Sequence, residues 1–460
     1  SLCCLSSKRG DINMKQHNLT QGSIGKGILV FLLPLLASTL IQQLYNTVDL
    51  IFVGKFCSTE ATAAIGASSL IITCLIGFFN GMAVGTNVVA AHIYGKQDKK
   101  GLKNVIQTVF MIGLIGGLIV TIIGIYFAPI FLKYMNTPQS ILDVAVKYLR
   151  IYTLSMISVV IYNLLCGILR AIGDSKSPMM FQIFGGIVNV IADFIFIVIL
   201  KMDVQGAAIA TLLSQTLTAV LTIRYFYKRS EEPKLHFTMR IFDKKIFKKI
   251  LMIGIPAGVQ SIVITLSNII IQSQINSFGV DAIAAFTAYF KIELILYLPI
   301  IVLGQALVSF VGQNYGAKQY DRINKGVKYS MIASVVITMG VSTLMIINSN
   351  YIFSIFTSNL DVMRYGKEIV SITFPFYFLY AILECLSSLV RGRGISIPPM
   401  VITLFSFCGI RIMFLIFLLM KNNSISSIAL TYPISWLSAV ILTSVYVYYN
   451  FVKEVKEAVC

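Results

Sequence analysis

Long apolar runs dominate the chain, and charged residues or Gly, Pro and Asn separate one run from the next. A membrane-spanning helix needs about 20 predominantly apolar residues, and these runs are long enough. No series of short segments alternates as a transmembrane β-barrel would require. The pattern predicts twelve spans, over residues 27–54, 61–91, 105–132, 146–172, 178–200, 205–227, 246–276, 281–312, 327–354, 366–391, 398–420 and 425–451.

Composition agrees with an integral membrane protein. Of the 460 residues 57% are hydrophobic and only 12% are charged, with a mean hydropathy of +0.83. A soluble domain needs more polar surface than this. We therefore expect an all-α membrane protein of twelve transmembrane helices, without a β-barrel.

The formal net charge of +18 indicates how the chain is oriented in the membrane and does not indicate ligand recognition. Most of the 37 Lys and Arg residues fall on alternate loops, so with a cytoplasmic N-terminus they stay on the cytoplasmic side. This predicts a multi-pass protein of the cell (plasma) membrane with both termini in the cytoplasm, and no nucleic-acid partner. Residues 1–13 lack the apolar core of a cleaved signal, and Met14 is a candidate start.

The second half of the chain repeats the first. Glu60-Ala-Thr-Ala-Ala-Ile returns as Asp281-Ala-Ile-Ala-Ala-Phe, and further matching positions are Tyr94 with Tyr315, Arg170 with Arg391, and Pro178 with Pro399. The unit has six spans, an even number, so both copies insert with the same orientation as a parallel repeat. This predicts two six-helix bundles that face each other across a central cleft and rock to give alternating access.

The repeat and the loops set the expected domain limits. We predict a cytoplasmic tail over 1–26, an N-lobe over 27–228, a cytoplasmic linker over 229–245, a C-lobe over 246–452 and a cytoplasmic tail over 453–460.

Two carboxylates interrupt the apolar spans of the first half, Asp49 in the first span and Asp193 in the fifth. A charge held in hydrocarbon costs roughly 2.5 to 3.5 kcal/mol on insertion scales, so such residues usually carry an ion, a proton or a cationic substrate. At ~1.5 Å of rise per residue, Asp49, Asp193 and Thr211 lie at one level, roughly 7 to 11 Å below the outer helix ends. Asn189 precedes Asp193 by four residues and shares its helix face.

These four residues offer only oxygen ligands, which suit a hard cation or, through the carboxylates, protons. Two neighbouring carboxylates also hold one proton between them more readily than one alone. We predict a Na+ or H+ coupling site at Asp49, Asn189, Asp193 and Thr211, without another cofactor. The competing interpretation is that these side chains hydrogen-bond neighbouring helices, as Asn and Thr often do.

The second half offers weaker candidates. Lys291 and Glu293 either face substrate in the cleft or pair with neighbours, and Glu384 and Arg411 are expected to form a buried structural pair. The three histidines lie in the tail or near loops, and the eight cysteines contain no CxxC pair. No His-based catalytic set, zinc site or disulfide framework is indicated.

With these motifs assembled, the sequence resembles the MATE (multidrug and toxic compound extrusion) family across nearly its whole length. The resemblance rests on Pro34, Tyr45-Asn-Thr-Val-Asp49-Leu-Ile-Phe-Val-Gly54, Tyr94-Gly95, Leu169-Arg-Ala-Ile-Gly-Asp-Ser-Lys-Ser-Pro178, Gly312-Gln-Asn-Tyr-Gly-Ala317, and Arg391-Gly-Arg-Gly394 with Pro399.

The resemblance implies two six-helix lobes that export cationic or amphipathic drugs in exchange for protons or sodium ions. Asp49, Asn189, Asp193 and Thr211 match the N-lobe cation positions of the DinF-like branch. NorM-like members carry an acid in the seventh span, whereas this chain has none there, and the repeat places Ile271 or Ile270 opposite Asp49. Coupling is therefore expected in the N-lobe alone.

We expect a secondary active antiporter, a monomer in membrane lipid, that takes small cationic or amphipathic molecules and is not an enzyme. A flippase for lipid-linked oligosaccharide is the alternative within the same structural superfamily. It would need a cleft rich in Arg and Lys, for which Lys291 and Arg411 are the clear candidates. A membrane-embedded enzyme such as an acyltransferase would need a His or a nucleophile and base at one depth.

Overall fold

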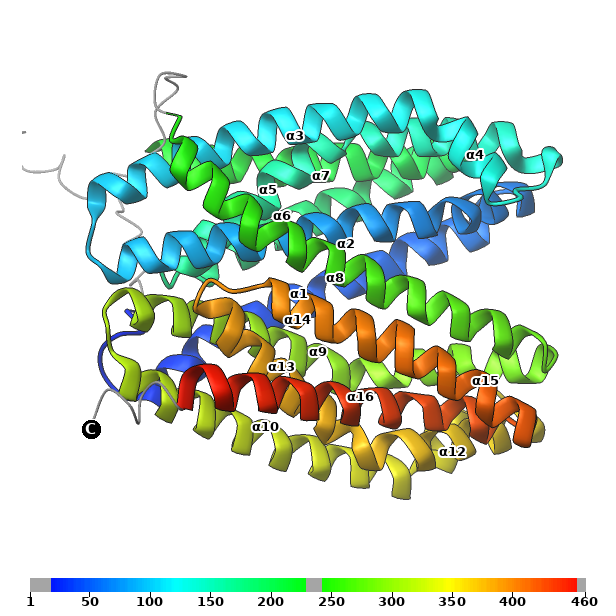
Figure 1. Cartoon of the computed structure of the whole chain (residues 1–460). Coiled ribbons are helices and arrows are strands. Elements are labelled where there is room, and N and C mark those ends of the chain that lie inside the picture. Colours follow the sequence, from blue (N-terminus) through cyan, green and yellow to red (C-terminus); the bar gives the residue numbers. More distant parts are fainter. Residues whose placement is uncertain (1–17, 229–241, 453–460) are drawn as a thin grey trace, which may run out of the picture.

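Two bundles of long helices lie side by side in the computed structural model, which describes residues 18–228 and 242–452 (Figure 1). The predicted C-terminal tail and most of the predicted linker and N-terminal tail lie outside these residues. The first bundle, here the N-lobe, contains α1 (Ile24–Phe56), α2 (Thr59–Gly95), α3 (Lys99–Tyr134), α4 (Gln139–Leu154), α5 (Met156–Ala171), α6 (Lys176–Asp193), the π-helix η1 (Phe194–Ile199) and α7 (Asp203–Lys228).

The second bundle, here the C-lobe, has the same order of spans. It contains α8 (Lys244–Asn276), α9 (Val280–Gly316), α10 (Tyr320–Ile347), α11 (Ser349–Ser354), α12 (Leu360–Thr373), the 3₁₀ turn η2 (Phe374–Phe376), α13 (Tyr377–Gly392), α14 (Ile397–Thr403), the π-helix η3 (Leu404–Ile410), α15 (Arg411–Lys421), α16 (Ile425–Val447) and the π-helix η4 (Tyr448–Val452).

The prediction of twelve spans in an all-α fold is confirmed for the described residues. Eleven helical segments there are long and apolar enough to cross a membrane, and the pair α4 and α5 makes a twelfth. That fourth span was expected as one helix over 146–172, but it begins at Gln139 and bends by 41° at Ser155. The Ser155 hydroxyl donates to the Tyr152 carbonyl at 2.6 Å, and hydroxyls that bond to the backbone in this way bend helices.

The irregular turns recur in both copies of the repeat. The span that corresponds to α4 and α5 is interrupted at η2, where Pro375 supplies no backbone N–H. The fifth span widens into η1, and its counterpart in the C-lobe widens into η3. π-helical turns are rare and frequently mark functional sites. The break in the fourth span therefore recurs at the same place in the repeat, whereas the π turn of the fifth span lies earlier in the C-lobe copy than in the N-lobe copy.

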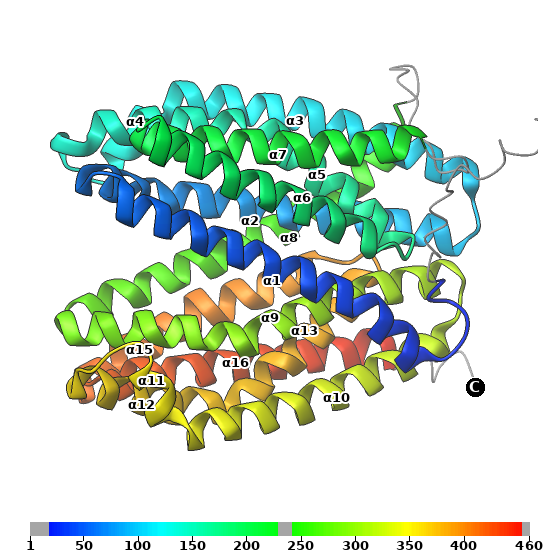
Figure 2. The same ribbon diagram turned by 180° about the vertical axis from the view of Figure 1, so that it is seen from behind.

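The first helix of each lobe begins inside the other lobe. α1 and α8 cross the molecule obliquely in opposite senses (Figures 1 and 2). One buried cluster joins the first half of α1 to α9, with Ile28, Phe31, Leu35, Leu307 and Phe310 among its members. Another joins the first half of α8 to α2, with Ile246, Ile250, Ile253, Phe79 and Met82 among its members. Each lobe thus holds one end of the other's first helix.

Glycines allow the two lobes to approach closely where α2 packs on α8. A Cβ placed on Gly81 would lie 2.2 Å from the backbone nitrogen of Gly258, and one on Gly85 would lie 2.8 Å from that of Gly254. Both pairs are spaced four residues apart, the small-xxx-small pattern that brings membrane helices into backbone contact. This seam is the main contact between the lobes at mid-depth.

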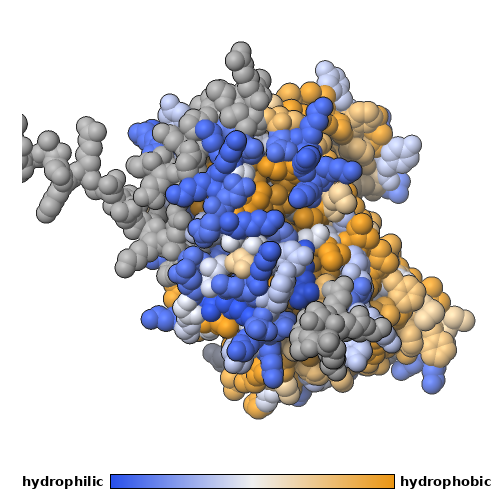
Figure 3. Space-filling view, turned by 60° about the vertical axis from the view of Figure 1, so that its left-hand side comes forward, coloured by the Kyte–Doolittle hydropathy of each residue, from blue (hydrophilic) through white to orange (hydrophobic). Residues whose placement is uncertain are grey.

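Hydrogen bonds join the lobes at the end of the molecule that carries Lys96, Lys99, Lys318 and Lys325, which we call the basic end. Hydrophilic side chains gather there (Figure 3). The bonds between the lobes run from Gln313 Nε2 to the Ala171 carbonyl (2.7 Å), between His92 Nε2 and the Gly392 carbonyl (2.7 Å), from Asn87 Nδ2 to Ser309 Oγ (2.9 Å) and from Arg170 Nη1 to Gln305 Oε1 (3.1 Å).

The glycine seam predicts a specific loss of stability. Gly81→Ala forces the backbones of α2 and α8 apart, so we expect it to lower the free energy of unfolding by about 1–3 kcal/mol. Gly116→Ala is the matched control, because nothing lies within 4 Å of a Cβ at Gly116. Thermal unfolding of both variants in detergent measures the effect, and equal melting temperatures would contradict the seam.

Candidate ion site

Asp49 and Asp193 lie on adjacent helices of the N-lobe. Asp49 is on α1, seven residues before its end, and Asp193 ends α6 immediately before η1. Asp193 is fully buried, and Asp49 is half-buried. Within the described residues, neither Asp193 oxygen nor the buried Asp49 Oδ1 has a hydrogen-bond partner. Buried carboxylates normally have partners, so these two require an explanation.

The two carboxylates lie within range of each other's charge and repel when both are ionised. Asn189 is buried one turn before Asp193, and its Oδ1 also lacks a partner among the described residues. Thr211 lies on α7 and donates its hydroxyl to the Ala207 carbonyl of its own helix, at 3.1 Å. The predicted set therefore comes from three mutually packed helices, and three of its members present unsatisfied oxygens.

A tyrosine and two glutamines that sequence reasoning missed connect these helices. Tyr45, one turn before Asp49, accepts a hydrogen bond from Gln182 Nε2 at 2.7 Å and also interacts with Gln215 of α7. A Cβ on Gly186 would lie 2.9 Å from Tyr45 Cδ1, so the absence of a side chain there lets α1 approach α6. Helical spacing could have identified two of the three. Tyr45 lies four residues before Asp49, and Gln215 lies four residues after Thr211, so each shares a helix face with a predicted site residue.

Tyr148 and Tyr152 of α4 also lie within range of the Asp49 charge. Their rings are buried, with centroids 5.9 Å apart. No signal in the sequence pointed to them, because α4 reads as an ordinary amphipathic helix.

A pocket opens beyond the carboxylates, at the end of the molecule opposite the basic end. Its lining includes Phe56, Ser58, Ile197, Lys201 and Asp203. Ile197 belongs to η1, the widened turn that starts directly after Asp193. The last two turns of α1 and η1 therefore separate the carboxylates from this pocket.

The available oxygens suit one small cation. Carboxylate and amide oxygens are hard ligands, which favour Na+ over softer metals, and the carboxylates alone can take protons. No group of three or more His, Cys, Asp or Glu side chains in the described part of the chain is arranged to hold a metal ion. Two carboxylates and one amide offer fewer oxygens than the roughly six to eight that Ca2+ takes, and the carboxylates can also hold protons.

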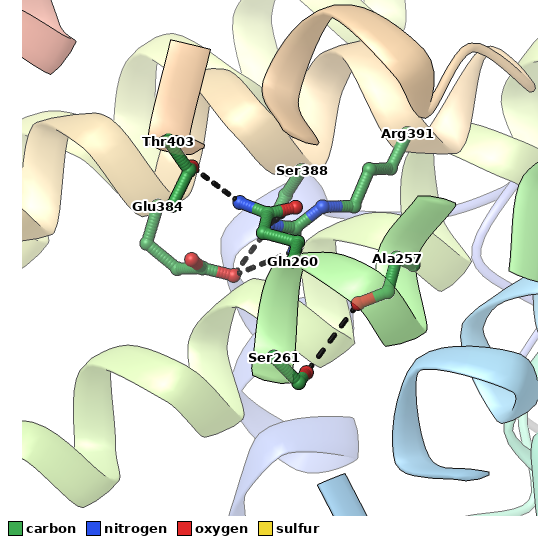
Figure 4. Close-up of polar contacts among 7 residues, drawn as sticks. All are labelled: Ala257, Gln260, Ser261, Glu384, Ser388, Arg391 and Thr403. Atoms are coloured by element: carbon green, nitrogen blue, oxygen red, sulfur yellow. Dashed lines mark hydrogen bonds and ion pairs between the residues drawn. The ribbon is translucent and has the colours of Figure 1, made fainter. Parts of the chain in front are cut away.

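Glu384 in the C-lobe has hydrogen-bond and ion-pair partners, unlike Asp193 and the buried Asp49 Oδ1. Its Oε1 lies 3.2 Å from Arg391 Nη1, and Arg391 Nη2 donates to Gln260 Oε1, also at 3.2 Å (Figure 4). Gln260 continues the network to Thr403 at 2.7 Å. The predicted pair of Glu384 with Arg411 is wrong. Arg391, two turns further along the same helix, pairs with the Glu384 carboxylate instead.

Among the remaining C-lobe candidates, Glu293 lies within range of the Arg411 charge but does not hydrogen-bond to it. Lys291 is exposed, whereas Glu293 Oε1 accepts hydrogen bonds from Tyr377 (3.0 Å) and Tyr289 (3.4 Å). Arg411 is buried, with its guanidinium over the rings of Phe407 and Tyr432. Lys291 and Glu293 stay predictions as substrate residues.

Comparison with known proteins settles the family. The sequence profile of the MatE family matches the chain twice, over residues 34–195 and 256–417. The chain belongs to the MATE family. Each match lies within one lobe, over its first five spans, which agrees with the repeat expected from the sequence. The family consists of membrane transporters.

Curated bacterial relatives extend along most of this MATE chain. It is 27% identical over 444 residues to the "Probable multidrug resistance protein YoeA" of Bacillus subtilis, covering 95% of each chain. It is 25% identical over 381 residues to the "Multidrug export protein MepA" of Staphylococcus aureus, covering 81% of this chain and 83% of that one.

Solved MATE structures share the fold. The structure titled "Crystal structure of MATE in the bent conformation" superposes with a TM-score of 0.90 at 23% identity, covering 97% of this chain and 99% of the other. The structure titled "Outward-facing conformation of a multidrug resistance MATE family transporter of the MOP superfamily" gives a TM-score of 0.87 at 24% identity, covering 94% and 97%. At these identities the likeness establishes architecture alone.

The contrast between free and paired acids predicts opposite effects of the same chemical change. Asp193→Asn removes an unpartnered buried charge, so we expect it to raise the melting temperature by a few degrees in buffer at pH 8 without sodium. Glu384→Gln breaks an ion pair and should lower the free energy of unfolding by about 1–3 kcal/mol. Calorimetry on the purified variants tests both, and destabilisation by both would show that Asp193 is an ordinary structural acid.

Proposed function

We propose that this MATE protein is a secondary active antiporter that exports cationic or amphipathic small molecules in exchange for H+ or Na+. The observation that carries the proposal is the pair Asp49 and Asp193, which lie within range of each other's charge. Neither Asp193 oxygen nor the buried Asp49 Oδ1 has a hydrogen-bond partner in the described chain. Isolated carboxylates in a membrane protein persist because something binds them. A coupling ion supplies the missing positive charge.

Binding of the ion would change how α1 packs. Two negative charges push α1 and α6 apart near Asp49 and Asp193, and a proton or sodium ion between them removes that repulsion. Asn189 Oδ1 is the further unsatisfied oxygen at the same level, and the Thr211 hydroxyl is close by on α7. The ion must bind one conformation more tightly than the other, since an equal affinity for both would give no coupling.

α1 is suited to carry this change to the C-lobe. Its second half packs on α6 and η1, whereas Phe31 and Leu35 of its first half belong to the cluster with α9. Pro34 lies in the first half, between Phe31 and Leu35, and leaves one backbone bond of the helix unmade. Movement of α1 at Asp49 therefore acts on both lobes.

Alternating access requires the lobes to part at the basic end. The bonds from Gln313 to Ala171 and between His92 and Gly392 cross between the lobes there, so this conformation is closed at that end. The glycine seam of α2 and α8 lies deeper and provides a pivot with little side-chain interlocking. Opening of the basic end would expose the space between the lobes to the side that we propose is the cytoplasm.

The substrate class rests on the relatives. The B. subtilis and S. aureus proteins carry the names multidrug resistance and multidrug export, and their similarity covers both lobes of this chain. We propose the same class of cargo here, with Lys291 and Glu293 as candidate substrate residues and the DinF-like N-lobe site as the coupling site. The protein would act as a monomer in the plasma membrane, with cytoplasmic termini, the lobe limits 27–228 and 246–452, and no cofactor.

The flippase alternative has less support. Recognition of a lipid pyrophosphate needs accessible basic side chains, and Arg411 is buried with its guanidinium hydrogen-bonded to Ser435 Oγ at 3.0 Å. No observation favours that function over drug export.

Asp49→Asn tests the coupling. In vesicles that hold the purified protein, we expect ethidium efflux driven by imposed sodium or proton gradients to fall at least about tenfold, because the variant cannot exchange an ion. Asp143→Asn is the matched control, since Asp143 is exposed on α4. Parent-like efflux by Asp49→Asn under both gradients would overturn the assignment.

The identity of the ion is measured separately from transport. A bound ion stabilises the folded protein, so either sodium replacing choline at constant ionic strength or a lower pH should raise the melting temperature by a few degrees. Asp193→Asn should abolish the response to whichever ion is effective, and Glu384→Gln should keep it. A parent protein that responds to neither ion would leave the site without its proposed occupant.

A further inference from the structure

Arg411 is a buried cation without a carboxylate in contact among the described residues. It is 1% exposed and begins α15 directly after η3. The guanidinium donates to Ser435 Oγ (3.0 Å), Ser267 Oγ (3.2 Å) and Asn268 Oδ1 (3.2 Å). Its Cζ lies 4.3 Å from the ring centroid of Phe407 and 4.8 Å from that of Tyr432. The Glu293 carboxylate lies within range of this charge without hydrogen-bonding to it. Neutral oxygens and π faces therefore make the direct contacts to a charge that is costly at membrane depth.

The repeat shows where Arg411 lies relative to the ion site. The two family matches, 34–195 and 256–417, begin and end at the same offset, which places Arg411 opposite Asn189. The loops before these helices match one position earlier, as Arg170 with Arg391 shows. η3 accounts for the extra residue, because it precedes Arg411, whereas η1 follows Asp193, and a π turn accommodates one inserted residue.

The other members of the ion site are replaced as well. At the same offset Ile271 lies opposite Asp49, and Leu415 lies opposite Asp193. Both replacements are buried and apolar. On α16, Tyr432 takes the place of Thr211 at the offset of the loops, and its ring faces the Arg411 guanidinium. The C-lobe counterpart has therefore lost two negative charges and gained one fixed positive charge.

We propose that the Arg411 guanidinium is a built-in substitute for the coupling ion in the C-lobe. It occupies the counterpart of the N-lobe site permanently and takes up oxygens of α8 and α16, Ser267, Asn268 and Ser435, that a free cation would need. The proposal rests on the proposed function only for the identity of the N-lobe ligand.

A tethered cation has a defined mechanical consequence. Arg411 connects α15 to α8 and α16, the C-lobe counterparts of α1 and α7. The N-lobe makes the corresponding connection through Tyr45 and Gln182, together with the proposed coupling ion, which binds and is released in each cycle. Because Arg411 cannot dissociate, the C-lobe keeps its ion-bound packing through the cycle and moves as a rigid body. One lobe exchanges the ion and the other serves as its fixed partner.

Chemical rescue tests this proposal. Arg411→Ala leaves a cavity of the shape and polarity of guanidinium, so guanidinium chloride at millimolar concentration should raise the melting temperature of that variant by a few degrees and restore part of its ethidium efflux. Urea, a neutral molecule of similar shape, should do neither. Arg364→Ala is the matched control, because the Arg364 side chain is 67% exposed. Equal responses to guanidinium and urea, or a response in Arg364→Ala, would overturn the proposal.

A second pair of variants separates charge from packing if Arg411→Ala does not fold. Arg411→Lys keeps a cation, whereas Arg411→Met fills similar volume without charge. We expect Arg411→Lys to melt at a higher temperature and to retain at least about tenfold more efflux than Arg411→Met. An Arg411→Met protein as stable and active as Arg411→Lys would show that the site needs only volume.

The result is separable from the coupling assignment. Guanidinium should still stabilise Arg411→Ala when Asp49→Asn is also present, because the two sites lie in different lobes. If Asp49→Asn transports normally while rescue persists, the N-lobe assignment fails and the Arg411 site stands. If Asp49→Asn is inactive and Arg411→Ala shows no rescue, the N-lobe assignment stands and the Arg411 proposal fails.

Discussion

The unpaired charge of two buried carboxylates is the constraint around which this protein is organised. Asp49 and Asp193 lie within range of each other's charge, and neither Asp193 oxygen nor the buried Asp49 Oδ1 has a partner in the described chain. Such an arrangement opposes folding, so the surrounding helices must over-determine it. Tyr45, Gln182 and the close approach at Gly186 do this by fixing α1 against α6 without neutralising the acids.

The two lobes share one helix arrangement but differ in how the charges of their polar sites are compensated. Both contain a break in the fourth span of the repeat and a π turn in the fifth. In the N-lobe the polar site beside the π turn is left unsatisfied, whereas in the C-lobe Arg411 fills it and Glu384 is paired with Arg391. A duplicated unit can thus become a moving part in one copy and a rigid part in the other.

The exchange of helix halves explains how such different lobes can act together. The first half of α1 packs in the C-lobe, and its second half carries Asp49 in the N-lobe. The first half of α8 packs in the N-lobe, and its second half contacts Arg411 in the C-lobe. Long helices transmit displacement because their backbone bonds are internal, while Gly81 and Gly85 of α2 let its backbone lie directly against that of α8. Bonds at the basic end, such as that of Gln313 with Ala171, hold the present conformation.

The sequence by itself determined the spans, the parallel repeat and the positions of Asp49, Asn189, Asp193 and Thr211, because apolar length and embedded charge are local properties. Only the tertiary structure decided which charges have partners. Glu384 pairs with Arg391 rather than Arg411, and Tyr148 lies within range of the two carboxylate charges on a helix with no distinguishing pattern. The bend at Ser155 and the crossing of α1 and α8 were equally hidden, since they depend on side-chain bonds and on contacts between residues far apart in the chain.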